Sequence, residues 1–271
     1  MKHIHFFLYA LGFALLGAMR LPGETTVYSV NVIGVQKVVA NPESVAGGRQ
    51  ILGVPLDALP GNLDQVIGTA GTANNSSALA DNVVIYDLDQ PLSDRYRTFY
   101  LRNNPNEGGR PMWRFAGSPQ FWATNVYLHP GQGFWYINRS ASAVTNVIVG
   151  DVQMADYVDT AIVPGLQLLS NPFSAPMTLG EAGLTNGVAT TSSATADNIT
   201  VFDPDALPAE QYKTYFLRPD PGNGNAPRWR FAGSPQSWAD GVVLEPHQGF
   251  WYRSRAGENF MWAAPRPYPA Q

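Results

Sequence analysis

The sequence predicts an all-β protein with minor helix, built from two duplicated β-sandwich or barrel-like domains. The chain of 271 residues contains 26 glycines and 22 prolines, a turn-rich composition that favours many short strands. Short runs of β-branched and aromatic residues alternate with clusters of Gly, Pro, Asn and Asp. The segment WRFAGSPQFW at 113–122 returns as WRFAGSPQSW at 229–238. Two separate domains, or one fused structure packed as a pseudo-twofold pair, would both fit this repeat.

Composition excludes several classes of function. The formal net charge is −4 and no run of Lys or Arg occurs, so we expect no nucleic-acid partner. The chain has no cysteine, which excludes disulfides, thiolate zinc sites and cysteine nucleophiles. Each domain must therefore be stabilised by its own hydrophobic core.

Residues 1–23 are typical of a signal peptide. Lys2, His3 and His5 precede an apolar stretch at 6–19, which is shorter than a comfortable membrane span. No second apolar segment of membrane length follows. We therefore expect export, with a mature protein that is secreted or lies at the cell-envelope surface and has no transmembrane segment.

The repeat sets the expected domain boundaries. With a shift of 116 positions, QGFWY at 132–136 matches 248–252 and DN at 81–82 matches 197–198. The boundaries follow as β-domain copy one at 24–144, copy two at 145–263 and a Pro-rich tail at 264–271. Because 145–152 has the composition of a strand that crosses the boundary, we expect the two copies to touch.

The strands are predicted from short apolar runs bounded by turn residues. Copy one contains such runs at 27–38, 49–54, 82–86, 96–102, 112–116 and 133–138. Copy two contains them at 165–170, 198–202, 211–218, 228–232, 249–254 and 260–263. One short helix per copy is expected, at 62–67 and after the capping-box spacing of Thr178 and Glu181.

Two of the three matched tryptophan pairs are predicted to be buried. Trp113 and Trp229 alternate with arginines along their strands, which places the indoles on the core face. Trp135 and Trp251 lie in GFWY runs that are apolar on both faces, which is typical of a covered central strand. The glycine that ends the preceding turn in both copies, Gly133 and Gly249, is expected to supply an unusual backbone angle.

The third pair is the candidate binding site. Trp122 and Trp238 follow a proline that ends the strand, so they are expected on loops. An indole flanked by amide and guanidinium groups suits a sugar ring or a partner surface, although it could instead cover the sheet edge. The candidate ligand-binding residues are Trp122, Trp238, Gln120, Gln236, Arg114 and Arg230.

A loop rich in carboxylates recurs in both copies and offers a tentative calcium site. Closely spaced carboxylates after a strand suit a hard cation, but they are also common in turns that cap their own backbone. The central glycine of an EF-hand is missing. The candidate ligands are Asp87, Asp89, Asp94, Asp203, Asp205 and Glu210. Otherwise no cofactor is expected.

No recognisable catalytic motif occurs. The two histidines of the mature chain are not equivalent, since His129 aligns with Glu245 and His247 with Gly131. No H-E-x-x-H, G-x-S-x-G, P-loop or G-x-G-x-x-G motif is present. We expect a protein that is not an enzyme, and a secreted hydrolase is the remote alternative.

The chain resembles exported tandem-repeat β-domain proteins of unassigned function, of the kind common in environmental bacteria of the Verrucomicrobia type. The resemblance rests on TVYSVNVIG at 26–34, LLSNP at 168–172 and PGQGFWY at 130–136. These motifs form the fold and carry no known catalytic residue. The resemblance thus implies an extracellular or envelope-surface interaction or structural protein, whose partner would be a surface protein or an extracellular polysaccharide.

Overall fold

The β-rich runs of the sequence form strands throughout the described part of the chain. The computed structural model describes residues 32–58, 61–88, 90–118, 120–234 and 236–269. Within these ranges the chain forms antiparallel sheets and one short α-helix, α2 (Leu63–Val66). The predicted all-β class is therefore confirmed. The signal-peptide prediction for 1–23 lies outside the described residues.

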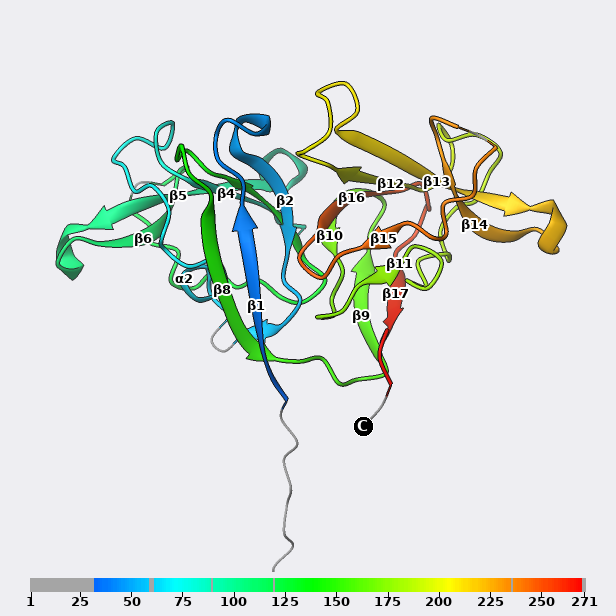
Figure 1. Ribbon diagram of the computed structural model, residues 1–271, viewed down its shortest axis with the longest axis horizontal. Helices are drawn as coiled ribbons and strands as arrows, with labels where there is room; N and C mark the ends of the chain where they lie inside the picture. The colour runs from blue at the N-terminus through cyan, green and yellow to red at the C-terminus, as the bar shows by residue number, and fades with distance from the viewer. Residues whose placement is uncertain (1–31, 59–60, 89, 119, 235, 270–271) are drawn as a thin grey trace, which may run out of the picture. The chain divides into compact units, whose positions relative to one another are not determined.

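The N-terminal lobe, residues 32–152, consists of a five-stranded sheet and a smaller three-stranded sheet (Figure 1). The larger sheet has the order β2-β7-β4-β5-β6 and the smaller has the order β1-β8-β3. The strands are β1 (Ile33–Ala40), β2 (Arg49–Gly53), β3 (Asp57–Ala58), β4 (Asn82–Tyr86), β5 (Tyr96–Asn104), β6 (Arg110–Phe115), β7 (Gly133–Ile137) and β8 (Val144–Asp151).

The C-terminal lobe, residues 153–268, has a similar arrangement. Its larger sheet has the order β10-β16-β12-β13-β14, and each strand takes the place of its counterpart in the N-terminal lobe. The strands are β9 (Tyr157–Ile162), β10 (Gly165–Ser170), β11 (Met177–Thr178), β12 (Asn198–Phe202), β13 (Tyr212–Asp220), β14 (Ala226–Phe231), β15 (Val243–Leu244), β16 (Gly249–Ser254) and β17 (Phe260–Pro265).

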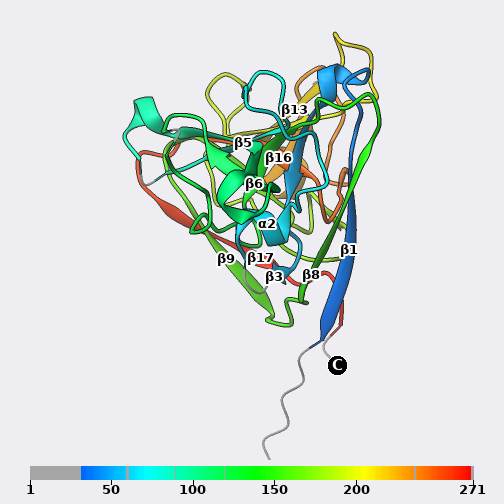
Figure 2. The same cartoon turned by 90° about the vertical axis from the view of Figure 1, so that its left-hand side faces the viewer.

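The core of each lobe lies between its five-stranded sheet and an antiparallel ribbon of two strands, which in the N-terminal lobe is part of the three-stranded sheet. In the N-terminal lobe β1 and β8 run side by side as a ribbon (Figure 2). This ribbon contributes Val38 and Ile148 to the core cluster. In the C-terminal lobe the ribbon β9–β17 contributes Ile162 and Trp262. Two apolar layers that exclude water between them explain why both lobes are stable without disulfides.

The strand predictions match the structure at every run named in the sequence within the described residues. The run at 145–152 forms β8, whose partners β1 and β3 belong to the N-terminal lobe. The expected boundary between 144 and 145 thus falls at the start of a strand that hydrogen-bonds to the first copy. Part of the expected tail is also packed, since Tyr268 stacks edge-on against Phe173.

Four strands and one helix differ from expectation. The two-residue strands β3, β11 and β15 are not predicted. No strand is predicted at β9, although Val158, Thr160 and Ile162 alternate with more exposed residues along it. The capping box of Thr178 and Glu181 forms, but only a single turn follows and no helix develops. Gly183, with φ +68°, follows that turn immediately in a left-handed conformation that ends helical geometry.

The two lobes meet at a seam with reciprocal contacts. The N–H of Gly53 donates to the carbonyl of His247, and the N–H of Ser170 donates to the carbonyl of Gly131, at 2.9 and 2.8 Å. Three pairs of equivalent side chains fill the apolar centre, namely Ile51 with Leu168, Tyr86 with Phe202, and Trp135 with Trp251. Reciprocal contacts between equivalent groups are the mark of a twofold arrangement.

The glycines that begin the two GFWY runs, Gly133 and Gly249, lie against the backbone of the other lobe at this seam. A Cβ on Gly133 would lie 2.5 Å from the carbonyl oxygen of Leu169, and one on Gly249 would lie 2.6 Å from that of Leu52. Neither glycine has a positive φ. The prediction of an unusual backbone angle is therefore wrong, and glycine is required because the backbone of the other lobe approaches closely.

Trp113 and Trp229 are buried in the two cores, as predicted, with 1% and 0% of their surface exposed. Trp135 and Trp251 are half-buried and lie at the seam rather than inside a lobe. Among the helices of the described ranges, none combines the length and the apolar character needed to cross a membrane.

Candidate functional site

Each candidate tryptophan lies on a loop that folds back along the last strand of its sheet. In the N-terminal lobe the N–H of Phe115 donates to the carbonyl of Phe121, and Trp122 forms a bridge with Arg114. The indole is half-buried, and the guanidinium carbon of Arg114 lies 5.2 Å from the ring centre. The backbone pairing therefore holds the ring over an arginine of β6.

The equivalent indole in the C-terminal lobe lies against two arginines. Trp238 forms a bridge with Arg230, and the guanidinium carbons of Arg228 and Arg230 lie 4.5 and 4.8 Å from its ring. Arg230 is 9% exposed, and its Nε has no hydrogen-bond partner among the described residues. The indole therefore contacts an arginine whose Nε is buried without a hydrogen-bond partner among the described residues.

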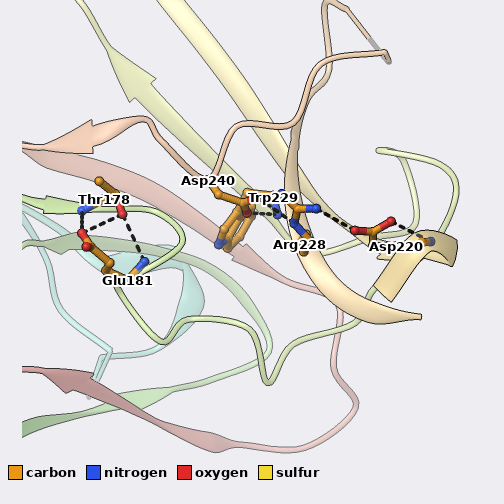
Figure 3. Close-up of polar contacts among 7 residues, drawn as sticks. Thr178, Glu181, Asp220, Arg228, Trp229 and Asp240 are labelled. Atoms are coloured by element: carbon orange, nitrogen blue, oxygen red, sulfur yellow. Dashed lines mark hydrogen bonds and ion pairs between the residues drawn. The ribbon is translucent and has the colours of Figure 1, made fainter. Parts of the chain in front are cut away.

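Arg228 is fixed by two carboxylates, as Figure 3 shows. It forms ion pairs of 2.6 Å with both Asp220 and Asp240, and Asp240 also accepts the backbone N–H of Trp229. The guanidinium of Arg228 holds the pKa of the Asp220 carboxyl below its usual range. The base of the Trp238 site is therefore preorganised.

The N-terminal lobe lacks this network. The positions of Asp220 and Arg228 are occupied by Asn104 and Met112, and the Asn104 amide lies 3.2 Å from the Met112 sulfur. The backbone N–H of Trp113 instead donates to Asp64, which lies on α2. The two loop sites are therefore similar in backbone but different in charge.

The structure gathers the arginines and indoles of the candidate site but does not gather the glutamines. Gln120 and Gln236 are exposed and form no hydrogen bond with any residue in the described ranges. The pattern that identified them was their nearness in sequence, which does not determine where an exposed side chain points.

The acidic loops use their first carboxylate in an ion pair across a hairpin. Asp87 accepts from Arg97 and Asp203 accepts from Lys213, both at 3.1 Å. Asp203 also accepts the backbone N–H of Asp205. This is the backbone-capping turn that the sequence offered as the alternative to a calcium site.

The remaining candidate metal ligands do not converge. Asp94 and Glu210 are exposed, and Asp89 lies outside the described residues. In the ranges that the structure describes, no three His, Asp or Glu side chains are placed to hold a metal ion. The described carboxylates therefore offer no calcium cage.

Two hollows flank the seam at equivalent positions. The first has a volume of 370 Å³ and lies between Asp87, His129 and Gln132 of one lobe and Asp159 and Gln167 of the other. The second has a volume of 280 Å³ and is lined by the counterparts Gln50, Phe202 and Gln248, together with Glu245 and His247. Each hollow thus contains one histidine, at a different position of the same turn.

A further hollow lies next to the first. It has a volume of 280 Å³, is lined by Arg97, Asn125 and Tyr127, and shares the lining residues Asp87, His129 and Gln132 with the first hollow. We call these two adjacent hollows together the seam groove. The sequence did not indicate it, although its signal was present where the copies differ: Asn125 and Tyr127 correspond to Gly241 and Val243.

The most enclosed polar pairs lie inside the lobes. Tyr136 donates to Asp81 at 2.7 Å and Tyr252 donates to Asp197 at 2.6 Å. Burial raises the pKa of the Asp81 carboxyl, although hydrogen bonds from Arg139 and Tyr136 act against this. Both carboxylates are fully buried, so these pairs organise the core and do not face a ligand.

The described surface therefore offers two guanidinium-backed indoles and a groove at the seam as its candidate binding features. Family models, curated proteins and solved structures were all compared with this chain, and none of them matches it.

Proposed function

We propose that the chain is an exported, non-enzymatic interaction protein built from two duplicated domains, and that it acts outside the cell or at the envelope surface. The internal repeat and the equal strand order of the two lobes support the duplication. The apolar stretch behind the basic N-terminus supports export.

One observation carries the proposal. Both lobes hold a half-exposed indole over an arginine through the same backbone bridge, at Trp122 with Arg114 and at Trp238 with Arg230. A rigid aromatic surface that is already ordered loses little entropy on binding. Two such surfaces in one chain gain avidity for a repetitive partner.

A carbohydrate is the second candidate partner, and the half-exposure of both rings favours it. Aromatic faces stack on the apolar face of sugar rings, while neighbouring polar groups bind the hydroxyls. The repeat of the site suits a polymer, because a polysaccharide offers the same ring many times.

The test is binding of residues 24–271 to a panel of soluble and insoluble polysaccharides, with Trp122→Ala, Trp238→Ala and the double variant beside the parent. We expect each single substitution to weaken binding about tenfold, which corresponds to about 1.4 kcal/mol. The single substitutions remove the avidity of the linked sites, and the double variant should lose binding because neither site remains.

Circular dichroism of each variant separates lost contact from lost folding. Chromatography of the incubated sugars tests the non-enzymatic part, because we expect every oligosaccharide to be recovered intact. Binding that is unchanged in the folded double variant would exclude the loop indoles as the contact, and shortened oligosaccharides would exclude a non-enzymatic role.

A further inference from the structure

The seam groove has the size of a binding site for a chain-like ligand. Its two adjacent hollows have volumes of 370 and 280 Å³ and share the lining residues Asp87, His129 and Gln132. Pockets for drug-sized ligands range from about 300 to 1,000 Å³. The larger hollow therefore falls within this range, and the smaller one provides a second contact area beside it.

The aromatic wall of the groove is fixed in place. Tyr127 is 48% exposed, and its backbone forms a bridge with Asn62. On either side, the N–H of Leu63 donates to the carbonyl of Val126 and the N–H of Leu128 donates to the carbonyl of Gly61. The ring is thus presented to solvent by a segment with a defined backbone.

The polar centre of the groove is also held. Gln132 accepts the backbone N–H of His129 through its side-chain oxygen, and its own N–H donates to the carbonyl of His129. This leaves the Gln132 amide nitrogen without a described acceptor, and Gln132 lines both hollows. Asp87 is ion-paired with Arg97.

The charges of the groove indicate an uncharged ligand. Its one arginine, Arg97, is paired with Asp87, and Asp159 is the other acidic side chain that lines it. An anionic polymer would meet no excess of positive charge. The remaining polar side chains include the amides of Asn125, Gln132 and Gln167 and the hydroxyl of Thr160, which bind sugar hydroxyls as donors and acceptors.

We propose that the seam groove binds a segment of a neutral polysaccharide, with Tyr127 stacked on one sugar ring and Asn125, His129 and Gln132 bound to hydroxyls. This deepens the proposed interaction function and rests on it, but it places the ligand at a site separate from the loop indoles. The groove needs both lobes, because Asp159 and Gln167 complete it from the C-terminal side.

The opposite side of the molecule provides matched substitutions. There the positions of Asn125 and Tyr127 are taken by Gly241 and Val243. Tyr127→Val and Asn125→Gly therefore replace groove residues with ones that the same fold carries in its second copy. Val243→Ala is the control on the opposite side.

The experiment is isothermal titration of residues 24–271 with hexasaccharides of β-1,4-glucose, β-1,4-xylose, β-1,4-mannose and β-1,3-glucose, and with an oligogalacturonate as the anionic comparison. We expect at least one neutral hexasaccharide to bind and the oligogalacturonate to bind at least tenfold more weakly. Tyr127→Val should weaken the neutral ligand at least tenfold, and Asn125→Gly should weaken it severalfold. Val243→Ala should leave the affinity within twofold of the parent.

The outcomes separate the two proposals. Neutral binding that survives Tyr127→Val but is lost in Trp122→Ala or Trp238→Ala would overturn the groove and keep the loop sites. Failure of every neutral hexasaccharide to bind, or tighter binding of the oligogalacturonate, would also overturn the groove. A surface-interaction role through the loop indoles would still stand in that case, because the polysaccharide panel tests it independently.

Discussion

At the scale of single residues, the two lobes share one feature, a buried aspartate that is hydrogen-bonded to a tyrosine. In the N-terminal lobe Asp81 accepts from Tyr136 and from the backbone N–H of Arg139. A Cβ on Gly71 would lie 2.1 Å from the Asp81 carboxylate, so only glycine lets the loop close over the pair. The matching letters at 81 and 197 were visible in the sequence, but their burial and their tyrosine partners, 55 positions away, were not.

The raised pKa of Asp81 predicts a pH dependence of stability. A carboxyl whose pKa is higher in the folded state binds its proton more tightly there, so its contribution to the unfolding free energy falls as pH rises above the ordinary value of about 4. A pKa that is higher by one pH unit lowers the unfolding free energy by about 1.4 kcal/mol once the pH exceeds the raised value. Asp81→Asn removes this titration.

We expect the parent protein to lose stability relative to Asp81→Asn as the pH rises above about 4, the ordinary pKa of an aspartate, until the raised pKa of the folded state is passed. Urea denaturation at a series of pH values measures the difference. All other titrating groups are common to both proteins and cancel. A difference that stays constant, or that grows in favour of the parent at higher pH, would contradict the raised pKa.

At the scale of elements, the strands were predictable because alternation of apolar and polar residues records which face is covered. β9 was missed since its exposed face carries Tyr157 and Ala161, which blur the alternation. The capping box at Thr178 was recognised correctly, but the glycine at 183 that stops the turn was not weighed against it. Local sequence signals therefore predicted where an element begins more reliably than they predicted how long it is.

In the hairpin β13–β14 Asp220 pairs with Arg228, whereas the hairpin β5–β6 has the neutral pair Asn104 and Met112 at the same positions. We therefore expect the effects of substituting Asp220 and Arg228 to depend on each other. Arg228→Met alone should destabilise the protein, because it leaves Asp220, 7% exposed, without its guanidinium. Asp220→Asn in addition recreates the Asn104–Met112 pair of the other lobe and should restore part of the lost stability.

Thermal unfolding of the two single variants and the double variant forms a complete mutant cycle. The double variant should be more stable than Arg228→Met alone. Strictly additive effects would mean that Asp220 and Arg228 do not depend on each other. The recovery should be incomplete, because Asp240 still lacks the arginine.

At the scale of the whole molecule, the seam makes the two lobes interdependent. The repeat predicted that the copies touch, yet it could not show which faces meet, because reciprocal contacts join residues of different elements. The seam groove escaped prediction for the same reason, since it combines turns of one lobe with β9 and β10 of the other. The loop indoles, by contrast, were found because each site is local in sequence.

Because the backbones of the two lobes approach closely at the seam, adding a methyl group there should lower the stability of the protein. Gly249→Ala would place a methyl group 2.5 Å from Ile51 and 2.6 Å from the carbonyl oxygen of Leu52. We expect a loss of about 1–3 kcal/mol in unfolding free energy, as is usual for overpacking. Urea denaturation followed by tryptophan fluorescence measures it.

Gly241→Ala is the matched control, because a Cβ there meets no atom within 4 Å. It should leave the unfolding free energy within about 0.5 kcal/mol of the parent. Equal losses for the two variants would show that the seam does not require glycine.

The seam contacts also bear on the exchange of lobes between two copies of the chain. Each lobe is complementary to the other lobe, so the same contacts could link the N-terminal lobe of one molecule to the C-terminal lobe of the next, head to tail. The short connection at 152–156 works against such exchange, because a tethered partner has an effective concentration on the order of millimolar. The short connecting segment thus favours pairing of the two lobes within one molecule over head-to-tail assembly of several molecules.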